Sequence, residues 1–470
     1  MMWKFNRFAE RTAVIDEYGK ALTYGELAGE GEALCKAAGG RCLVIQLCRN
    51  TLGSLLGYTA FLEGGIVPIM LAAELDRELF RSLYETYKPK FLWTPESFVK
   101  EGCTPVYARF GYHLLQTPYG DAVELFPELA LLLTTSGSTG SPKLVRKSYR
   151  NLRSNTDSIV DYMKITREER PITTLPMNYT YGLSIINTHL DVGATLLLTD
   201  KGIAQKEFWA FFKEQGATSF GGVPYTFEML DRMRFTRMDL PSLRSMNQAG
   251  GKLLPSLHEK LAKWCEETGR EFLIMYGQAE ASPRMGYLPA ERSLEKAGAM
   301  GVVIPGGRFE LVGVDGEIIT RPDVTGELRY YGENVTLGYA EKAEDLALGD
   351  ERHGVLDTGD MAKMDEDGFF TIVGRKKRFL KLFGNRINLD ETERMLKAAF
   401  EGVECACGGV DDHLYLFATE ESALPAMRGF LAEKTGLNLS AFHTRALAAI
   451  PKNDAGKTLY KELEKYYDGI

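Results

Sequence analysis

The chain has 470 residues, 44% of them hydrophobic and 26% charged, so we expect a globular protein with at least two domains. Its formal net charge of −8 excludes a general attraction to nucleic acid or to an anionic membrane, and no nucleic-acid partner is expected. Seven widely spread cysteines do not form a disulfide framework and favour a reducing, cytoplasmic location. Residues 1–11 lack the apolar core of a signal peptide, and no apolar run is long enough to span a membrane.

The N-terminal part of the chain alternates predicted strands with predicted helices. A short hairpin precedes a helix that Thr23 would cap, with Glu26 three residues later as in a capping box. Two continuous apolar runs predict buried strands, on either side of a segment with helical periodicity: residues 42–47, 66–70 and 52–62. This alternation predicts an α/β fold with a partly parallel sheet.

A loop rich in glycine and hydroxyl side chains follows a predicted buried strand at residues 129–133. Residues 134–143 read TTSGSTGSPK, in which Gly137 and Gly140 allow tight turns and a close approach of the backbone. Backbone N–H groups, hydroxyls and the Lys143 ammonium are suitable partners for a polyphosphate. The GxxxxGK[ST] spacing of a Walker loop is absent, and an isolated GSTG is more typical of a surface loop.

The middle of the chain contains further predicted elements. Residues 149–163 have the pattern of a helix, whereas the glycine-marked segments 220–224 and 248–252 predict turns between periodic segments. From residue 301 onward, short alternating segments predict a small antiparallel sheet or barrel.

Two short motifs in this region carry carboxylates. Residues 276–280 read YGQAE, which offers an aromatic ring for adenine and the Glu280 carboxylate for Mg²⁺. Residues 357–360 read DTGD, where the Asp360 carboxylate, which only accepts hydrogen bonds, suits a vicinal diol. Taken singly, these motifs are equally typical of a helix start and a β-turn.

Two basic segments stand near the end of the chain. Residues 374–384 read GRKKRFLKLFG, and a helix with a capping box would begin at Asp390 with Glu393 three residues later. Residues 451–457 read PKNDAGK and end in Lys457. Alone, the first segment is typical of a solvated charged face and the second of a surface turn.

In this order and at this spacing, the motifs together resemble those of the adenylate-forming (ANL) superfamily, which holds acyl- and aryl-CoA synthetases, nonribosomal peptide synthetase adenylation domains and firefly-type luciferases. The resemblance implies an α/β fold with a large N-terminal AMP-binding domain, residues 1–375, of mixed and parallel sheets with helices. It also implies a small β-barrel-like subdomain at about 300–373 and a small, mobile α+β C-terminal domain, residues 376–470. A further family motif at 326–339 is interpreted as structural.

The activity that the resemblance implies is ATP-dependent adenylation of a carboxylic acid, giving acyl-AMP and pyrophosphate, followed by acyl transfer to a thiol. ATP and Mg²⁺ would be the cofactors, and the acceptor would be CoA or the phosphopantetheine of a carrier protein acting in trans. Three alternatives stay open: a catalytically inactive nucleotide-binding regulator, a stand-alone amino-acid-activating adenylation protein, and a luciferase-like oxygenase.

The resemblance also implies roles for individual residues. Lys457, Glu280 and Lys143 are expected to be catalytic, with Glu280 as the metal ligand. Lys377 would be the hinge between the domains, and Gly384 would lie on the thiol-acceptor side. The expected ATP- and AMP-binding residues are Thr135, Ser136, Gly137, Ser138, Thr139, Gly140, Lys143, Gly250, Gly251, Tyr276, Gly277, Gln278, Ala279, Glu280, Asp360, Arg375 and Lys457.

Residues 175–184, LPMNYTYGLS, resemble the family segment that lines the carboxylate pocket. Amino-acid adenylation domains usually carry Asp near the position of Thr180, where it pairs with the substrate ammonium. A buried ammonium without a counter-charge is costly, so an aryl or acyl acid is favoured over an α-amino acid. The expected pocket residues are Tyr179, Thr180, Tyr181, Tyr225 and Gln278.

The chain departs from the usual family pattern at three positions. CoA synthetases often carry His where this chain has Tyr179 and Arg where it has Tyr460, and many relatives carry Thr in place of Ala279. The residue at Tyr460 leaves the choice between CoA and a carrier protein open.

Overall fold

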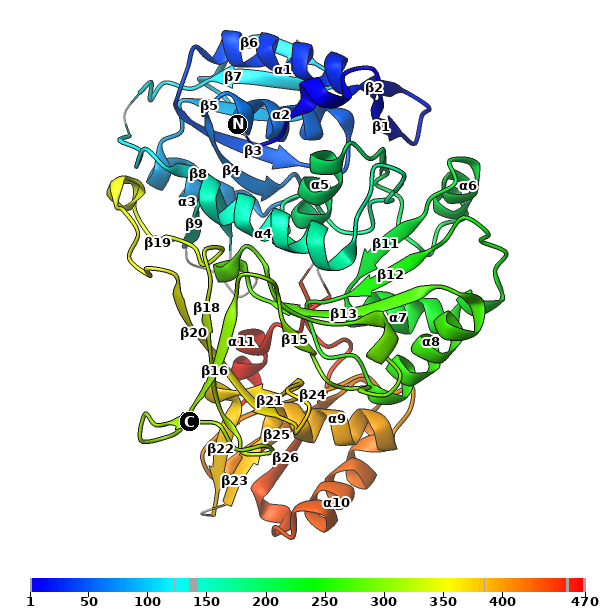
Figure 1. The fold of residues 1–470 in the computed structure, drawn as a ribbon. Helices are drawn as coiled ribbons and strands as arrows, with labels where there is room; N and C mark the ends of the chain where they lie inside the picture. Colours follow the sequence, from blue (N-terminus) through cyan, green and yellow to red (C-terminus); the bar gives the residue numbers. More distant parts are fainter. Residues whose placement is uncertain (1, 122, 135–142, 384, 454–455, 468–470) are drawn as a thin grey trace.

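The computed structural model describes residues 2–121, 123–134, 143–383, 385–453 and 456–467. It is an α/β protein made of several sheets with their helices, and its N-terminal and C-terminal parts lie at opposite ends of the molecule (Figure 1). None of the helices in these ranges is both long and apolar enough to cross a membrane. Short 3-10 helices lie at Phe5–Phe8, Phe235–Arg237, Ala279–Ala281, Ala290–Arg292, Ala343–Ala347, Lys376–Arg378, Glu421–Ala423, Leu439–Ala441 and Glu464–Tyr466.

The largest sheet has eight strands and belongs mainly to the N-terminal part of the chain (Figure 1). Their order is β19 (Gly338–Ala340), β9 (Leu144–Ser148), β8 (Leu129–Thr134), β4 (Val67–Ala72), β3 (Leu43–Cys48), β5 (Phe91–Pro95), β7 (Tyr112–Gln116) and β6 (Thr104–Arg109). The central strands β8, β4, β3 and β5 are parallel, and the outer neighbours are antiparallel. A three-stranded sheet consists of β10 (Leu196–Leu198), β1 (Thr12–Asp16) and β2 (Ala21–Thr23).

Helices cover both faces of the largest sheet. Four of them share an apolar core with one face, namely α1 (Tyr24–Ala38), α2 (Leu52–Glu63), α4 (Tyr149–Met163) and α5 (Thr180–Val192). Helix α3 (Arg77–Tyr87) packs on the other face. The predicted capping box of α1 is confirmed, because the Thr23 hydroxyl accepts a hydrogen bond from the Glu26 N–H (3.1 Å) and the Glu26 carboxylate accepts one from the Thr23 N–H (2.8 Å).

The second sheet provides one edge of the candidate site. It consists of β11 (Ser219–Gly222), β12 (Ser245–Gln248), β13 (Glu271–Gly277), β14 (Arg284–Leu288) and β15 (Val302–Val303), and its region also holds α6 (Lys206–Glu214), α7 (Pro224–Arg232) and α8 (Pro255–Thr268). Strands β11, β12 and β13 are parallel, so their C-terminal ends meet at the same edge.

The predicted turn at 220–224 was wrong for residues 220–222, which complete β11. The glycine signal there has a packing cause. A Cβ on Gly221 would lie 2.9 Å from the Tyr181 hydroxyl, so the strand carries glycine where helix α5 approaches it closely.

The third sheet is entirely antiparallel, in the order β17 (Ile318–Ile319), β16 (Arg308–Val312), β18 (Gly326–Tyr331), β20 (Val355–Met364) and β21 (Phe370–Arg375). The DTGD motif lies within β20 instead of forming a turn between elements. Asp360 on β20 is paired in register with Arg375 on β21. This pairing brings an acid and a base from two motifs to neighbouring positions.

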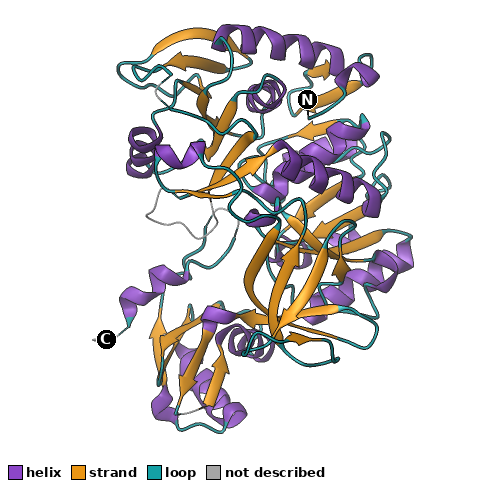
Figure 2. Ribbon diagram, turned by 60° about the vertical axis from the view of Figure 1, so that its left-hand side comes forward, coloured by secondary structure: helices purple, strands orange, loops and turns teal. Residues whose placement is uncertain are grey.

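The C-terminal residues have cores of their own. They form the hairpin β22 (Phe379–Leu382) and β23 (Asn385–Asn388), the sheet β24 (Cys405–Val410), β25 (His413–Ala418) and β26 (Phe442–Ala446), and the helices α9 (Leu389–Ala399), α10 (Leu424–Thr435) and α11 (Tyr460–Leu463). The two apolar clusters in this part contain no residue from before Leu380. Figure 2 shows these elements as a lower body joined to the rest.

The predicted capping residue of α9 was wrong. The side chain of Asn388, not that of Asp390, accepts hydrogen bonds from the Asp390 and Glu391 N–H groups (3.0 and 3.3 Å). Glu393 is buried and pairs with the Arg378 guanidinium (2.7 Å). The local pattern was misleading because this tertiary ion pair takes the carboxylate that a capping box would use.

Candidate active site

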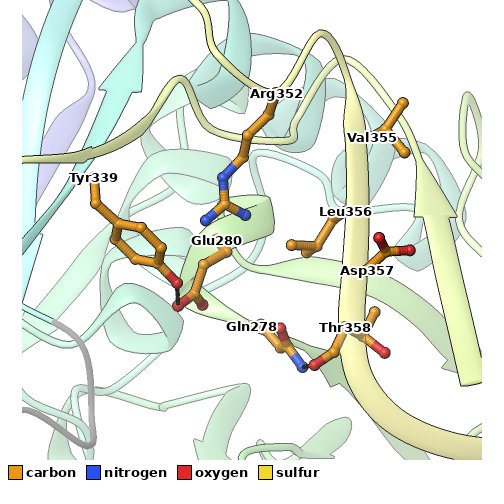
Figure 3. Close-up of a pocket in the computed structure, with 8 residues that line it drawn as sticks. All are labelled: Gln278, Glu280, Tyr339, Arg352, Val355, Leu356, Asp357 and Thr358. Atoms are coloured by element: carbon orange, nitrogen blue, oxygen red, sulfur yellow. Dashed lines mark hydrogen bonds between the residues drawn. The ribbon is translucent and has the colours of Figure 1, made fainter.

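A cavity of about 430 Å³ opens beside Glu280 (Figure 3). It is lined by Gln278, Glu280, Tyr339, Arg352, Val355, Leu356, Asp357 and Thr358. The Tyr339 hydroxyl donates a hydrogen bond to Glu280 Oε1 (2.7 Å), and the Arg352 guanidinium lies 4.7 Å from the centre of the Tyr339 ring. The carboxylate is therefore held at one oxygen, and its second oxygen is suited to a hard cation such as Mg²⁺.

Within the part of the chain that the structure describes, no group of three or more acidic, histidine or cysteine side chains could hold a metal ion. The role of Glu280 as the metal ligand stays a prediction, and it fits the usual chemistry of Mg²⁺, an ion that keeps several waters and binds substrate phosphates. The motif at 326–339, interpreted from sequence as structural, contributes Tyr339 to this site.

Asp360 stands at the centre of a second group of polar residues. Its Oδ2 accepts hydrogen bonds from the Tyr276 hydroxyl (2.5 Å) and from Gln278 Nε2 (3.0 Å), and the Arg375 Nε lies 3.9 Å from Oδ1. Burial raises the pKa of the Asp360 carboxyl, while these three neighbours lower it in part. Burial and the adjacent carboxylate raise the pKa of Tyr276 well above its usual value, so its hydroxyl remains a donor.

Lys457 reaches this site from the C-terminal part of the chain. Its Nζ lies 5.6 Å from the centre of the Tyr179 ring, and its Cε would lie 3.8 Å from a Cβ built on Gly250. Burial, followed by the charge of Arg375, lowers the pKa of the Lys457 ammonium to about 8, against the opposite effect of Glu280 and Asp360. The structure thus brings Lys457 close to the residues of the YGQAE and DTGD motifs.

The glycines of the site allow close approach. Gly250 has a φ of +85°, and a Cβ there would lie 2.7 Å from the Tyr179 hydroxyl. A Cβ on Gly277 would lie 1.8 Å from the Pro283 carbonyl oxygen, and one on Gly251 would lie 3.0 Å from the Pro224 ring. These positions therefore tolerate no larger residue without movement of their neighbours.

Lys143 lies on the same side as Glu280. Its Nζ is 3.8 Å from the centre of the Tyr339 ring and 3.3 Å from Glu341 Oε1. The predicted phosphate-binding residues Thr135, Ser136, Gly137, Ser138, Thr139 and Gly140 lie outside the described residues, as does Gly384. Lys377 is described and is exposed, in a 3-10 turn between β21 and β22.

The predicted aromatic pocket divides into two parts. Tyr179 and Tyr181 contact each other edge to face, with ring centres 6.2 Å apart, and Tyr181 is buried. Residues 180–184 form the first turn of α5, and Tyr179 precedes it. Tyr225, by contrast, is 40% exposed and packs against the C-terminal part, 5.0 Å below the Lys452 ammonium.

Two buried cations beside the pocket were not predicted from the sequence. Lys147 Nζ donates to the Ala279 carbonyl (2.6 Å) and lies 3.4 Å from the Thr180 hydroxyl, while Arg284 lies 4.6 Å above the Tyr181 ring. Burial lowers the pKa of Lys147 to about 7, against the attraction of Glu280. The available sequence signal was weak: two basic residues, Arg146 and Lys147, follow two apolar residues in a strand that is buried throughout.

Comparisons with known proteins identify the family of the chain. The model of the AMP-binding enzyme family matches residues 2–340. The chain is 30% identical to indoleacetate–CoA ligase of Aromatoleum aromaticum over 417 residues (83% of this chain and 80% of the relative), and 30% identical to feruloyl-CoA synthase of an Amycolatopsis species over 428 residues (86% and 84%). Over 330 residues it is 29% identical to oxalate–CoA ligase of Arabidopsis thaliana, of which it spans 62%.

The solved structures that resemble the chain include O-succinylbenzoate–CoA synthetase of Bacillus subtilis. The complex with AMP has a TM-score of 0.80 at 21% identity, covering 98% of this chain and 96% of that one. The complex with ATP and magnesium has a TM-score of 0.78 at 22% identity, covering 98% of both chains. At these identities the likeness shows the fold.

The chain therefore belongs to the AMP-binding enzyme family, and it is an AMP-forming acid–thiol ligase. The predicted family and the predicted α/β fold are confirmed. The domain boundaries, the role of each site residue and the cytoplasmic location stay predictions.

Proposed function

We propose that this ligase converts a carboxylic acid and MgATP into an acyl-adenylate and pyrophosphate, and then transfers the acyl group to the thiol of CoA. The observation that carries the proposal is the convergence of Lys457, Glu280 and Asp360 from three distant parts of the chain. The curated relatives named above are CoA ligases, which supports CoA over a carrier protein.

In the adenylation step, a carboxylate oxygen of the acid attacks the α-phosphorus, and the bond to pyrophosphate breaks. Negative charge grows on the phosphate oxygens, and the Lys457 ammonium stabilises it. Asp360 accepts hydrogen bonds from the ribose hydroxyls, with Tyr276 and Gln278 fixing its carboxylate and Arg375 beside it. Mg²⁺, when bound, would neutralise phosphate charge, and Glu280 would hold it. Lys143 and residues 135–140 would contact the phosphates.

The thiol step needs a different arrangement, because Lys457 takes up space at the acyl end. The C-terminal part, residues 376–470, would rotate about Lys377 and bring the side of Gly384 to the adenylate. Its separate apolar cores support movement as one body. Tyr460 donates a hydrogen bond to Glu393 (3.0 Å) and lies 3.6 Å below the Arg378 guanidinium, so it acts within that body.

The acid would be an aryl or acyl acid without an α-ammonium. Lys147 Nζ lies 3.4 Å from the hydroxyl of Thr180, the position at which amino-acid-activating relatives were expected to carry Asp. A substrate ammonium there would face a buried basic side chain in place of a carboxylate, so its desolvation would not be offset by a counter-charge.

Carboxylate-dependent exchange of radioactive pyrophosphate into ATP tests the proposal, with fatty, aryl, hydroxy and α-amino acids as the panel. We expect exchange with non-amino acids, and CoA thioester formation when CoA is added. Exchange with α-amino acids alone would contradict the acid class. Thioester formation only on a carrier protein would contradict the acceptor, and silence with every acid would favour a non-catalytic regulator.

A further inference from the structure

Arg284, at the start of β14, is a buried guanidinium whose hydrogen bonds are incomplete. The side chain is 2% exposed, Nη1 is 3.2 Å from the Tyr162 hydroxyl and also contacts the Met275 sulfur, and Nη2 is 3.2 Å from the Ser184 hydroxyl. Among the residues that the structure describes, none accepts a hydrogen bond from its Nε–H. No carboxylate among the described residues forms an ion pair with it. A buried cation without a counter-charge is costly to fold, so a partner from outside the chain would offset this cost.

Helix α5, which carries Ser184, also contacts a second buried basic side chain, Lys147 of β9. Thr180 and Ser184 are four residues apart on α5, so their hydroxyls share one face, separated by about one turn of roughly 5.4 Å. The Thr180 hydroxyl is near Lys147 and the Ser184 hydroxyl is near Arg284. Lys147 is fully buried and, within the part of the chain described here, also has no ion pair. Two buried basic side chains thus lie against this face of α5, and Glu280 is near enough to Lys147 to attract it.

Arg284 and Lys457 each lie close to one of two tyrosine rings that contact each other. Lys457 Nζ lies 5.6 Å from the centre of the Tyr179 ring, the Tyr179 and Tyr181 ring centres are 6.2 Å apart, and the Arg284 guanidinium lies 4.6 Å from the Tyr181 ring. The two cations therefore approach different rings of the same aromatic pair. The hydrocarbon part of an acid bound beside this pair would pack against the tyrosine rings.

We infer that the acid substrate is a dicarboxylic acid, whose second carboxylate pairs with Arg284 while its first carboxylate is adenylated beside Lys457. This inference rests on the proposed function. The Nε–H and Nη2 share the edge of the guanidinium that binds a carboxylate side-on through two parallel hydrogen bonds. Lys147 adds positive potential on the same face of α5.

Matched acids test this inference in the pyrophosphate exchange assay. The first pair is adipate and its monomethyl ester, and the second is 4-carboxyphenylacetate and phenylacetate. Because a site built to bind a polar group rejects an analogue that lacks it, we expect kcat/KM of the wild-type enzyme to favour the diacid of at least one pair by about 100-fold or more. Equal use of the two members of both pairs, or a preference for the monoacids, would overturn the inference while the adenylation proposal stands.

The variants Arg284→Met and Arg284→Lys separate a substrate contact from a structural role. Arg284→Met is expected to lower the ratio of diacid to monoacid kcat/KM about 100-fold, because diacid use falls far more than monoacid use. Arg284→Lys is expected to restore part of the preference, because it keeps the charge and loses the two parallel hydrogen bonds. An equal fall with diacid and monoacid would assign Arg284 a structural role and overturn the inference.

Two further outcomes complete the test. Thermal melting of both variants checks that they fold. If neither folds, the wild-type ratio of diacid to monoacid use still decides the inference. Silence of the wild-type enzyme with all acids, with ATP binding intact, would contradict the proposed function, and the inference would fall with it.

Discussion

The ammonium of Lys457 lies 5.6 Å from the centre of the Tyr179 ring, although the two residues belong to the C-terminal and N-terminal parts of the chain. The approach depends on Gly250, because its missing side chain leaves the space in which the lysine and the tyrosine meet. This relationship places a cation from the C-terminal part next to the predicted acid pocket.

The pH dependence of adenylation should follow the protonation of Lys457. Burial lowers the pKa of this ammonium to about 8, so it is charged below that pH and loses its charge above it. We therefore expect kcat/KM for ATP to fall as the pH rises through about 8. In Lys457→Arg, which stays charged, this alkaline limb should disappear. The same limb in both proteins would assign the titration to another group.

The hydrogen bond from Tyr276 to Asp360 should contribute to nucleotide binding. Tyr276→Phe removes one of the two donors that fix the carboxylate and leaves Gln278 in place. We expect the Kd for AMP to weaken by roughly 10- to 150-fold, since a hydrogen bond to a charged group contributes about 1.5–3 kcal/mol. Titration calorimetry measures the change. Tyr331→Phe is the control, because Tyr331 lies on β18, next to the strand that carries Asp360, and its hydroxyl donates to Glu310 instead. An unchanged Kd would show that Tyr276 does not support ribose binding by Asp360.

Gly250→Ala should impair activity by steric contact. Its Cβ would lie 2.7 Å from the Tyr179 hydroxyl, whereas a Cβ on Gly316, at nearly the same φ, would meet nothing within 4 Å. Gly316→Ala is thus the matched control for backbone strain alone. We expect similar thermal melting in the two variants and a loss of exchange activity only in Gly250→Ala. Full activity of Gly250→Ala would show that the approach of Lys457 does not need this space.

Lys377→Pro tests the proposed hinge. Lys377 is exposed, and proline restricts the backbone φ about which the C-terminal part would rotate. We expect a slower overall rate of thioester formation with pyrophosphate exchange largely preserved. Lys377→Ala serves as the control, because it removes the lysine side chain without restricting the backbone φ. An unchanged overall rate in the proline variant would place the hinge elsewhere.

Local signals in the sequence were sufficient for much of the fold. The Thr23 cap, the helix at 149–163 and the apolar strands of the largest sheet appear as predicted, because their residues satisfy local hydrogen bonding and burial together. The error at Asp390 arose from tertiary structure, since an ion pair with Arg378 uses the Glu393 carboxylate.

The candidate site was less predictable than the fold. The motifs could nominate Glu280, Asp360 and Lys457. They could not indicate the residues that bind these side chains, because such residues come from distant elements, as Tyr339 does for Glu280. Arg284 and Lys147 were missed for the same reason, because nothing in their local sequence says that both lie against α5. Sequence spacing carries no information on such contacts between strands and helices.

The most direct test of the account is to measure both half-reactions of Lys457→Ala, with Lys452→Ala, on the same loop, as the control. Losing one preorganised charge donor should lower pyrophosphate exchange on the order of 100-fold, while transfer of the acyl group from supplied acyl-adenylate to CoA proceeds at the wild-type rate. Equal loss in the two half-reactions, or unimpaired exchange, would contradict the assignment of Lys457 to the adenylation step.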